Sequence, residues 1–235
     1  MKIAIINFSG NVGKTTIAAH LLKPRMPNAQ IYSIESINAG ADASGVAVEK
    51  LKGKKFGNLI DAILLLDDAI IDVGASNVED FIKQMQQYDG SHEEFDIFIV
   101  PIVREKKVQS DTVNTIQALR LIGVPAKNIR VVFNKVETDE DVQEEFPAIF
   151  GLGKIRKECV VSDKCVIFGN EVFERLKSVG KSLGDLSKDN TDYRAKMKTA
   201  SNDDEKQLAV TMIALQRLAR TANRNLDEVF REICK

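Results

Sequence analysis

Short apolar runs recur along the first half of the chain, separated by stretches with helical spacing or turn residues. They cover residues 2–7, 31–34, 69–73, 97–103 and 129–133. Apolar runs of this length, bounded by glycines and other turn residues, are typical of strands buried inside a sheet. Their alternation with helical segments predicts an α/β fold with a doubly wound, mostly parallel sheet and C-terminal helices.

Two helices are expected between these strands. The first covers residues 14–22 and ends before Pro24, because proline cannot continue a helix. The second covers residues 108–122 and ends at the Gly-Val-Pro of residues 123–125. Its apolar side is formed by Val108, Val113, Ile116, Leu119 and Ile122. This side should cover one face of the sheet.

The pattern is looser in the second half of the chain. Residues 158–168 predict one or two short strands, followed by a helix over 170–179. Residues 181–204 are rich in Ser, Lys, Asp and Asn, so we expect a flexible polar segment there. Two amphipathic helices, 205–221 and 225–234, then follow. The expected organisation is a nucleotide-binding domain over 1–180, the polar segment over 181–204 and a helical extension over 205–235 that packs on the domain.

Composition narrows the class of protein. The 235 residues, 44% of them hydrophobic, fit one large α/β domain. A net charge of −1 provides no global attraction to nucleic acid or to an anionic membrane. The three cysteines form no CxxC pair, and reduced thiols are expected. No apolar run approaches the roughly 20 residues that span a bilayer, so we expect a cytoplasmic protein.

Residues 8–16, Phe-Ser-Gly-Asn-Val-Gly-Lys-Thr-Thr, lie between the first strand and the first helix. The P-loop pattern GxxxxGK[ST] has glycine where this chain has Phe8, but its chemistry is retained. Gly10 and Gly13 allow a tight turn whose N–H groups face phosphate oxygens at a helix N-terminus. Nucleotide contacts are therefore expected from Ser9, Gly10, Asn11, Val12, Gly13, Lys14, Thr15 and Thr16.

Three side chains have specific expected roles at this loop. Lys14 can reach the β and γ phosphates of a nucleotide, and Thr15 supplies a hydroxyl for Mg²⁺. Asp72 ends an apolar strand, which places its carboxylate at the carboxyl edge of the sheet, where it can hold a Mg²⁺-bound water. The alternative for Asp72 is an ordinary carboxylate in a turn.

The stretch SGNVGKTTIAAHLL, residues 9–22, resembles the deviant Walker motif of the ParA/MinD superfamily. Residues 69–76 resemble the strand and switch loop of that family, and residues 131–135 its base-recognition strand. The resemblance extends over about the first 170 residues. It implies ATP and Mg²⁺ as cofactors, a nucleotide-dependent homodimer, a DNA-binding adaptor protein as partner, and a role in plasmid positioning or maintenance.

The chain departs from this family at two places. The signature lysine, which reaches the nucleotide of the partner subunit, would fall at Ser9, and serine cannot supply that charge. Of two family aspartates, the first corresponds to Glu35, whereas the second falls at Ile37. Glu35 or Asp42 must then orient the attacking water, so the expected catalytic residues are Lys14, Glu35 and Asp42. Hydrolysis is expected to be slow, partner-dependent or absent.

Residues 134–137, Asn-Lys-Val-Glu, leave two choices of base. They differ from the guanine-reading pattern NKxD only by Glu137, whereas the family reads adenine through the residue at Asn134. Because a longer acid misplaces the bidentate acceptor, ATP is favoured over GTP. Contacts from Asn134 and Lys135 are expected with either base.

The leading functional hypothesis is an ATP-dependent molecular switch. A small-molecule synthetase and a nucleotide-binding module without hydrolysis are the alternatives. An apolar stripe in the tail packs on its own domain or binds a partner. The acids Asp227, Glu228 and Glu232 argue against stable membrane association. Lys50, Lys52, Lys54 and Lys55 form a solvated face or a weak DNA contact.

Overall fold

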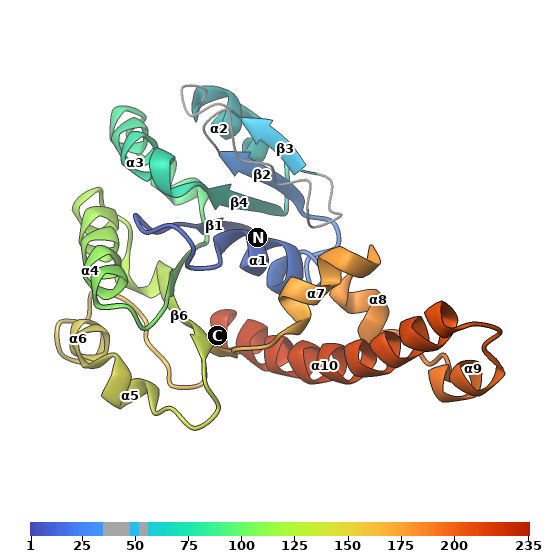
Figure 1. Cartoon of the computed structure of the whole chain (residues 1–235). Coiled ribbons are helices and arrows are strands. Elements are labelled where there is room, and N and C mark those ends of the chain that lie inside the picture. Colours follow the sequence, from blue (N-terminus) through green and yellow to red (C-terminus); the bar gives the residue numbers. More distant parts are fainter. Residues whose placement is uncertain (35–47, 52–55) are drawn as a thin grey trace.

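The computed structural model describes residues 1–34, 48–51 and 56–235, and its centre is a seven-stranded sheet (Figure 1). All pairings between its strands are parallel, in the order β3-β2-β4-β1-β5-β6-β7. The strands are β1 (Lys2–Ile5), β2 (Gln30–Ile34), β3 (Val48–Leu51), β4 (Ala69–Val73), β5 (Ile97–Ile102), β6 (Ile129–Val136) and β7 (Val166–Phe168). The predicted doubly wound fold is confirmed, and all five expected apolar runs contain strands.

Helices cover both faces of the sheet. On one face lie α2 (Phe56–Leu64), α3 (Val78–Gln87), α4 (Lys106–Leu121), α5 (Val142–Glu145) and α6 (Pro147–Phe150). On the other lie α1 (Lys14–Thr16), its π-helical continuation η1 (Ile17–Leu22), α7 (Val172–Val179) and α10 (Asp203–Ile233), and α8 (Leu183–Lys188) packs against α7 and α10. Alternate residues of each central strand point into these two separate cores, which explains why the strands are apolar throughout.

The tail differs from the sequence prediction. One helix, α10, runs over 31 residues where two helices, 205–221 and 225–234, were expected. Its buried residues recur at helical spacing without a break, at Ala209, Met212, Leu215, Gln216, Ala219, Ala222, Leu226, Val229 and Ile233. Polar residues 223–225 therefore do not end the helix, because the apolar stripe on either side of them stays in phase. The polar residues 181–204 contain α8 and α9 (Tyr193–Thr199).

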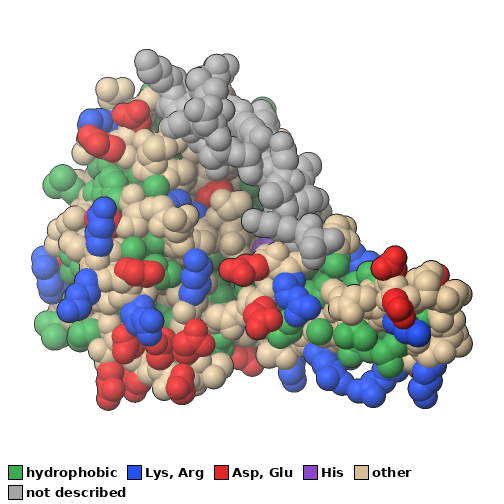
Figure 2. Space-filling view, viewed as in Figure 1, with side chains coloured by type: hydrophobic (Ala, Val, Ile, Leu, Met, Phe, Trp, Pro, Cys, Tyr) green, Lys and Arg blue, Asp and Glu red, His purple; other side chains and the backbone are tan. Residues whose placement is uncertain are grey.

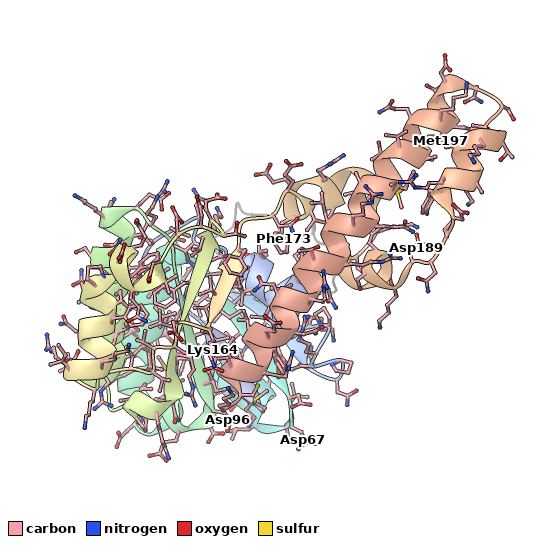
Figure 3. All side chains as sticks on the ribbon, turned by 90° about the horizontal axis from the view of Figure 1, so that it is seen from below. Asp67, Asp96, Lys164, Phe173, Asp189 and Met197 are labelled. Atoms are coloured by element: carbon pink, nitrogen blue, oxygen red, sulfur yellow. The ribbon has the colours of Figure 1, made fainter. Side chains whose placement is uncertain are left out.

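The helix α10 crosses beneath the sheet and then extends past it (Figure 3). We call α9 together with residues 203–214 of α10 the arm. Met197, on α9, lies at the far end of this projection. Leu208 and Val210 on the arm are exposed, and α9 has no buried residue. Figure 2 shows apolar and charged side chains side by side on the surface of this extension.

Arg25 lies just after η1 and joins the end of that helix to α10. Its guanidinium donates to the backbone oxygens of His20 and Leu21, and to the backbone and side-chain oxygens of Asn223. It also forms a 2.7 Å ion pair with Asp227. The Arg25 side chain is only 10% exposed. One buried cation therefore caps the first helix and fixes α10 against it.

We predict that Arg25→Ala lowers the free energy of unfolding by about 2–3 kcal/mol, because hydrogen bonds to a charged group are lost and the acceptors stay partly buried. Chemical denaturation measures this change. Arg217→Ala, on an exposed position of the same long helix, is the matched control and should stay within about 0.5 kcal/mol of the parent. Equal stability of the two variants would show that Arg25 does not fix α10.

Candidate functional site

The loop between β1 and α1 contains two residues in the left-handed backbone region. Asn11 has φ 58° and Gly13 has φ 89°. A Cβ atom at Gly13 would lie 2.2 Å from Nδ2 of Asn134, so no other residue fits there. A Cβ at Gly10 would meet nothing within 4 Å, which leaves open space beside that part of the loop. The helix start at Gly13 has no side-chain cap, so its first N–H groups keep their capacity to bind an anion.

Lys14 lies inside the loop rather than in solvent. Its side chain donates to the backbone oxygens of Asn7, at 3.1 Å, and Ser9, at 2.7 Å, and the residue is 7% exposed. Burial lowers the pKa of Lys14 to about 8, and the nearby carboxylate of Asp72 partly opposes this decrease. The ammonium group is therefore held at the loop by the chain's own carbonyl oxygens.

Thr15 and Asp72 lie beside Lys14. Asp72 is the penultimate residue of β4, and Ile5 at the end of β1 is its neighbour in register. The Thr15 hydroxyl donates to Oδ2 of Asp72 at 2.7 Å. Asp72 is only 4% exposed, and burial raises its pKa against the opposing effects of Thr15 and Lys14. The strand order thus brings a hydroxyl, a carboxylate and an ammonium group to one point at the carboxyl edge.

This donor set fits Mg²⁺. The ion prefers hard oxygen ligands, and at nucleotide sites it usually takes one or two protein oxygens, with waters and phosphate oxygens completing the shell. The hydroxyl of Thr15 and the carboxylate of Asp72 would hold it. Within the described ranges, no group of three or more His, Cys, Asp or Glu side chains is arranged to hold a metal ion.

Helix α4 braces the first half of the loop. Asn7 donates to the Pro101 backbone oxygen and the Thr112 hydroxyl, both at 2.8 Å, and accepts from the Ser9 backbone N–H. The Ser9 hydroxyl donates to Oδ2 of Asp111 at 2.5 Å. Thr115 accepts from the Phe8 backbone N–H. A carboxylate therefore lies next to the position at which the family has its signature lysine.

Sequence reasoning missed these bracing residues. Thr112 and Thr115 lie on the covered side of α4 and are fully buried. Polar residues on the side of a helix that should be apolar were the available signal. Asn7 gave a second signal, as an amide at the end of an otherwise apolar strand.

Asn134 and Lys135 meet the second half of the loop. The Asn134 amide donates to the Val12 backbone oxygen at 2.8 Å, and the Lys135 ammonium donates to the Asn11 backbone oxygen at 3.2 Å. Lys135 has φ 57°, and its backbone N–H donates to the Asn134 side chain. The structure therefore brings these two predicted base contacts together with the loop. A contact with the base itself stays a prediction.

The other predicted site residues are distributed as follows. Ser9, Gly10, Asn11, Val12, Gly13, Lys14, Thr15 and Thr16 form the loop and the helix start. Glu35 and Asp42, the expected water-orienting acids, lie outside the described residues, as do Lys52, Lys54 and Lys55. Lys50 belongs to β3.

No protein-family model matches the chain, and no curated protein matches it at a significant level. Several solved structures do. The MinD cell division protein of Aquifex aeolicus has a TM-score of 0.53 at 12% identity, covering 91% of this chain and 95% of that one. Apo McdA of Cyanothece has a TM-score of 0.51 at 15% identity, with 91% and 98% covered.

A third structure is that of a protein assigned to plasmid partition in Borrelia burgdorferi B31, bound to AMPPNP. It has a TM-score of 0.50 at 12% identity and covers 91% of this chain and 97% of its own. The chain therefore has the fold of P-loop ATPases of the ParA/MinD type. Within that class, its structural neighbours are proteins of the MinD, McdA and plasmid-partition kinds.

We predict that nucleotide affinity decreases above about pH 8. Only protonated Lys14 binds phosphate oxygens, and its pKa of about 8 means that binding must recover a proton at higher pH. Affinity should then fall about tenfold per pH unit until the pKa of the complex is reached. Titration calorimetry in buffers of different ionisation enthalpy measures both the affinity and the proton uptake.

Lys14→Arg is the control, because a guanidinium group stays protonated throughout this range. Whatever its affinity, this variant should show no proton uptake at position 14 on binding nucleotide. Constant affinity of the parent protein up to pH 9.5, without proton uptake, would contradict the prediction.

Proposed function

We propose that this protein is a nucleotide-dependent molecular switch that binds ATP with Mg²⁺. The observation that carries the proposal is the convergence of Lys14, Thr15 and Asp72 at one point on the carboxyl edge of the sheet. Lys14 would contact the β and γ phosphates, while Thr15 and Asp72 would hold the ion. When bound, Mg²⁺ neutralises charge on the phosphates.

The biological setting of the switch is part of the proposal. We infer from the departures at Ser9, Asn11 and Glu35, together with the helical tail, a resemblance to StbB, a plasmid stability and conjugation protein. We infer a cytoplasmic protein acting in plasmid stability, partition or conjugation, with a DNA-binding adaptor protein as its partner. Direct DNA contact would be weak. No helix in the described parts of the chain is both long and apolar enough to cross a membrane.

A second candidate for the bound nucleotide is GTP. Lys135 and Asn134 are already fixed to the loop, and the carboxylate of Glu137 lies beside Gly169, where a Cβ would be 3.4 Å from its Oε1. An acid at this point could accept from the two adjacent N–H donors of guanine, which adenine lacks. Glu137 is one methylene longer than the aspartate of NKxD, so ATP stays the first choice.

The test is direct titration of the protein with ATP and GTP, with and without Mg²⁺. Lys14→Ala should abolish binding, because the charge-assisted phosphate contact is lost while little apolar area is exposed. Thr15→Ala and Asp72→Ala should bind nucleotide but lose the increase in affinity that Mg²⁺ gives. Undiminished affinity in a folded Lys14→Ala protein would contradict nucleotide binding at this loop.

A further prediction concerns the missing lysine. Ser9 is buried and its hydroxyl is bonded to Asp111, so position 9 offers no cation to a second subunit. Two facing nucleotides would then bring uncompensated negative charge into one interface. We expect little stable dimer and little turnover with ATP and Mg²⁺ alone.

Sedimentation and phosphate-release assays measure the two quantities. Ser9→Lys, which restores the cation, should gain dimer and turnover, whereas Ser9→Ala should behave like the parent. A partner could supply the cation in trans, and such a residue can increase turnover by about 10³ to 10⁵. A tight, hydrolysing dimer of the unmodified protein would show that another side chain performs this role.

A further inference from the structure

Ser33, in β2, carries a buried hydroxyl group that forms no hydrogen bond. The residue is 1% exposed, and its Oγ has no partner. Among the described side chains only two other buried atoms share this property, in Arg130 and Glu158. Leaving a buried polar group unpaired costs about 1–3 kcal/mol. An apolar residue would avoid that cost, so the hydroxyl calls for an explanation.

The register of the sheet places Ser33 next to the magnesium ligand. Ser33 in β2 and Asp72 in β4 are neighbours in register. Two residues earlier, Ile31 and Ile70 are also neighbours, and both pack in the core that contains the loop-following helix. Because alternate residues of a strand share a face, Ser33 and Asp72 point to the same side as that helix.

The hydroxyl is near the carboxylate but does not bond to it. Thr15 occupies Oδ2 of Asp72, which is one of its two carboxylate oxygens. Mg²⁺ keeps several waters when it binds at nucleotide sites, and each such water needs hydrogen-bond acceptors. Side chains that hydrogen-bond to these metal-bound waters orient them and so help to fix the geometry of the site.

We propose that Ser33 is a positioning residue of the magnesium site, where its hydroxyl accepts a hydrogen bond from a Mg²⁺-bound water next to Asp72. This inference rests on the proposed nucleotide and Mg²⁺ binding. The hydroxyl is unpaired in the protein alone and gains its partner when the ion and nucleotide bind. Its energetic cost in the free protein is thus offset in the complex.

Ser33→Ala tests the inference, because it removes the hydroxyl with almost no change in volume. Without ligand, the denaturation midpoint of this variant should equal or exceed that of the parent, since no hydrogen bond is lost. The Mg²⁺ concentration that half-saturates the increase in nucleotide affinity should rise about tenfold. Affinity measured in EDTA should not change.

Ser91→Ala is the matched control. Ser91 is also a buried serine, but its hydroxyl donates to the Met85 backbone oxygen at 3.3 Å. This variant should lower the denaturation midpoint and leave the Mg²⁺ dependence as in the parent. The Ser33→Ala and Ser91→Ala variants are therefore expected to show opposite changes in the denaturation midpoint and in the Mg²⁺ dependence of nucleotide affinity.

An unchanged Mg²⁺ dependence of Ser33→Ala would overturn the inference, and so would an equal loss of affinity in EDTA. A lowered denaturation midpoint without ligand would also overturn it, because the hydroxyl would then have a structural partner. Thr15→Ala separates this failure from that of the proposed function. If Thr15→Ala loses its response to Mg²⁺ while Ser33→Ala keeps it, only the role of Ser33 is wrong.

Discussion

The burial of the Lys14 ammonium next to the Asp72 carboxylate is the constraint on which the rest of the site depends. A charge removed from water needs compensating hydrogen bonds and an opposite charge. Two loop carbonyls and Asp72 supply these to Lys14. The carbonyls can face inward only if the loop closes tightly, which accounts for the left-handed backbone at Asn11 and Gly13. The shape of the loop is thus fixed by contacts within the chain itself.

The amino-acid sequence predicts the parts of this arrangement that follow from local order along the chain. Apolar runs locate the strands, and the parallel sheet then places the end of β4, with Asp72, beside the end of β1. Lys14 and Thr15 follow from the spacing of the glycines before them. Each of these inferences needs only the order of the elements along the chain and the fact that parallel strands end at the same edge of the sheet.

The rest of the site and of the fold depends on contacts between segments that are far apart in the sequence. Such contacts leave no local sequence pattern. Asp111 lies 102 positions from Ser9, and Arg25 lies 202 positions from Asp227. Two tail helices, 205–221 and 225–234, were expected, and residues 223–225 near their junction are polar. In the structure Asn223 binds Arg25, and Asn225 bonds both the Phe168 N–H and the Val166 backbone oxygen at the edge of β7. These polar residues are tertiary contacts on a continuous helix rather than a break between two.

Stability is distributed unevenly along α10. Its second half packs in the same core as Leu21 and Leu22 of the helix that follows the loop, and Arg25 fixes the two together. The arm has less such support, because α9 buries no residue, Leu208 is 58% exposed, and of residues 203–214 only Ala209 and Met212 are buried. Regions with few buried apolar contacts open at lower free energy than the core. The second half of α10 therefore belongs to the same stable unit as the loop between β1 and α1, whereas the arm opens more easily, although Gln216 and Arg220 of α10 hold the segment before α9 through the Asp189 backbone oxygen.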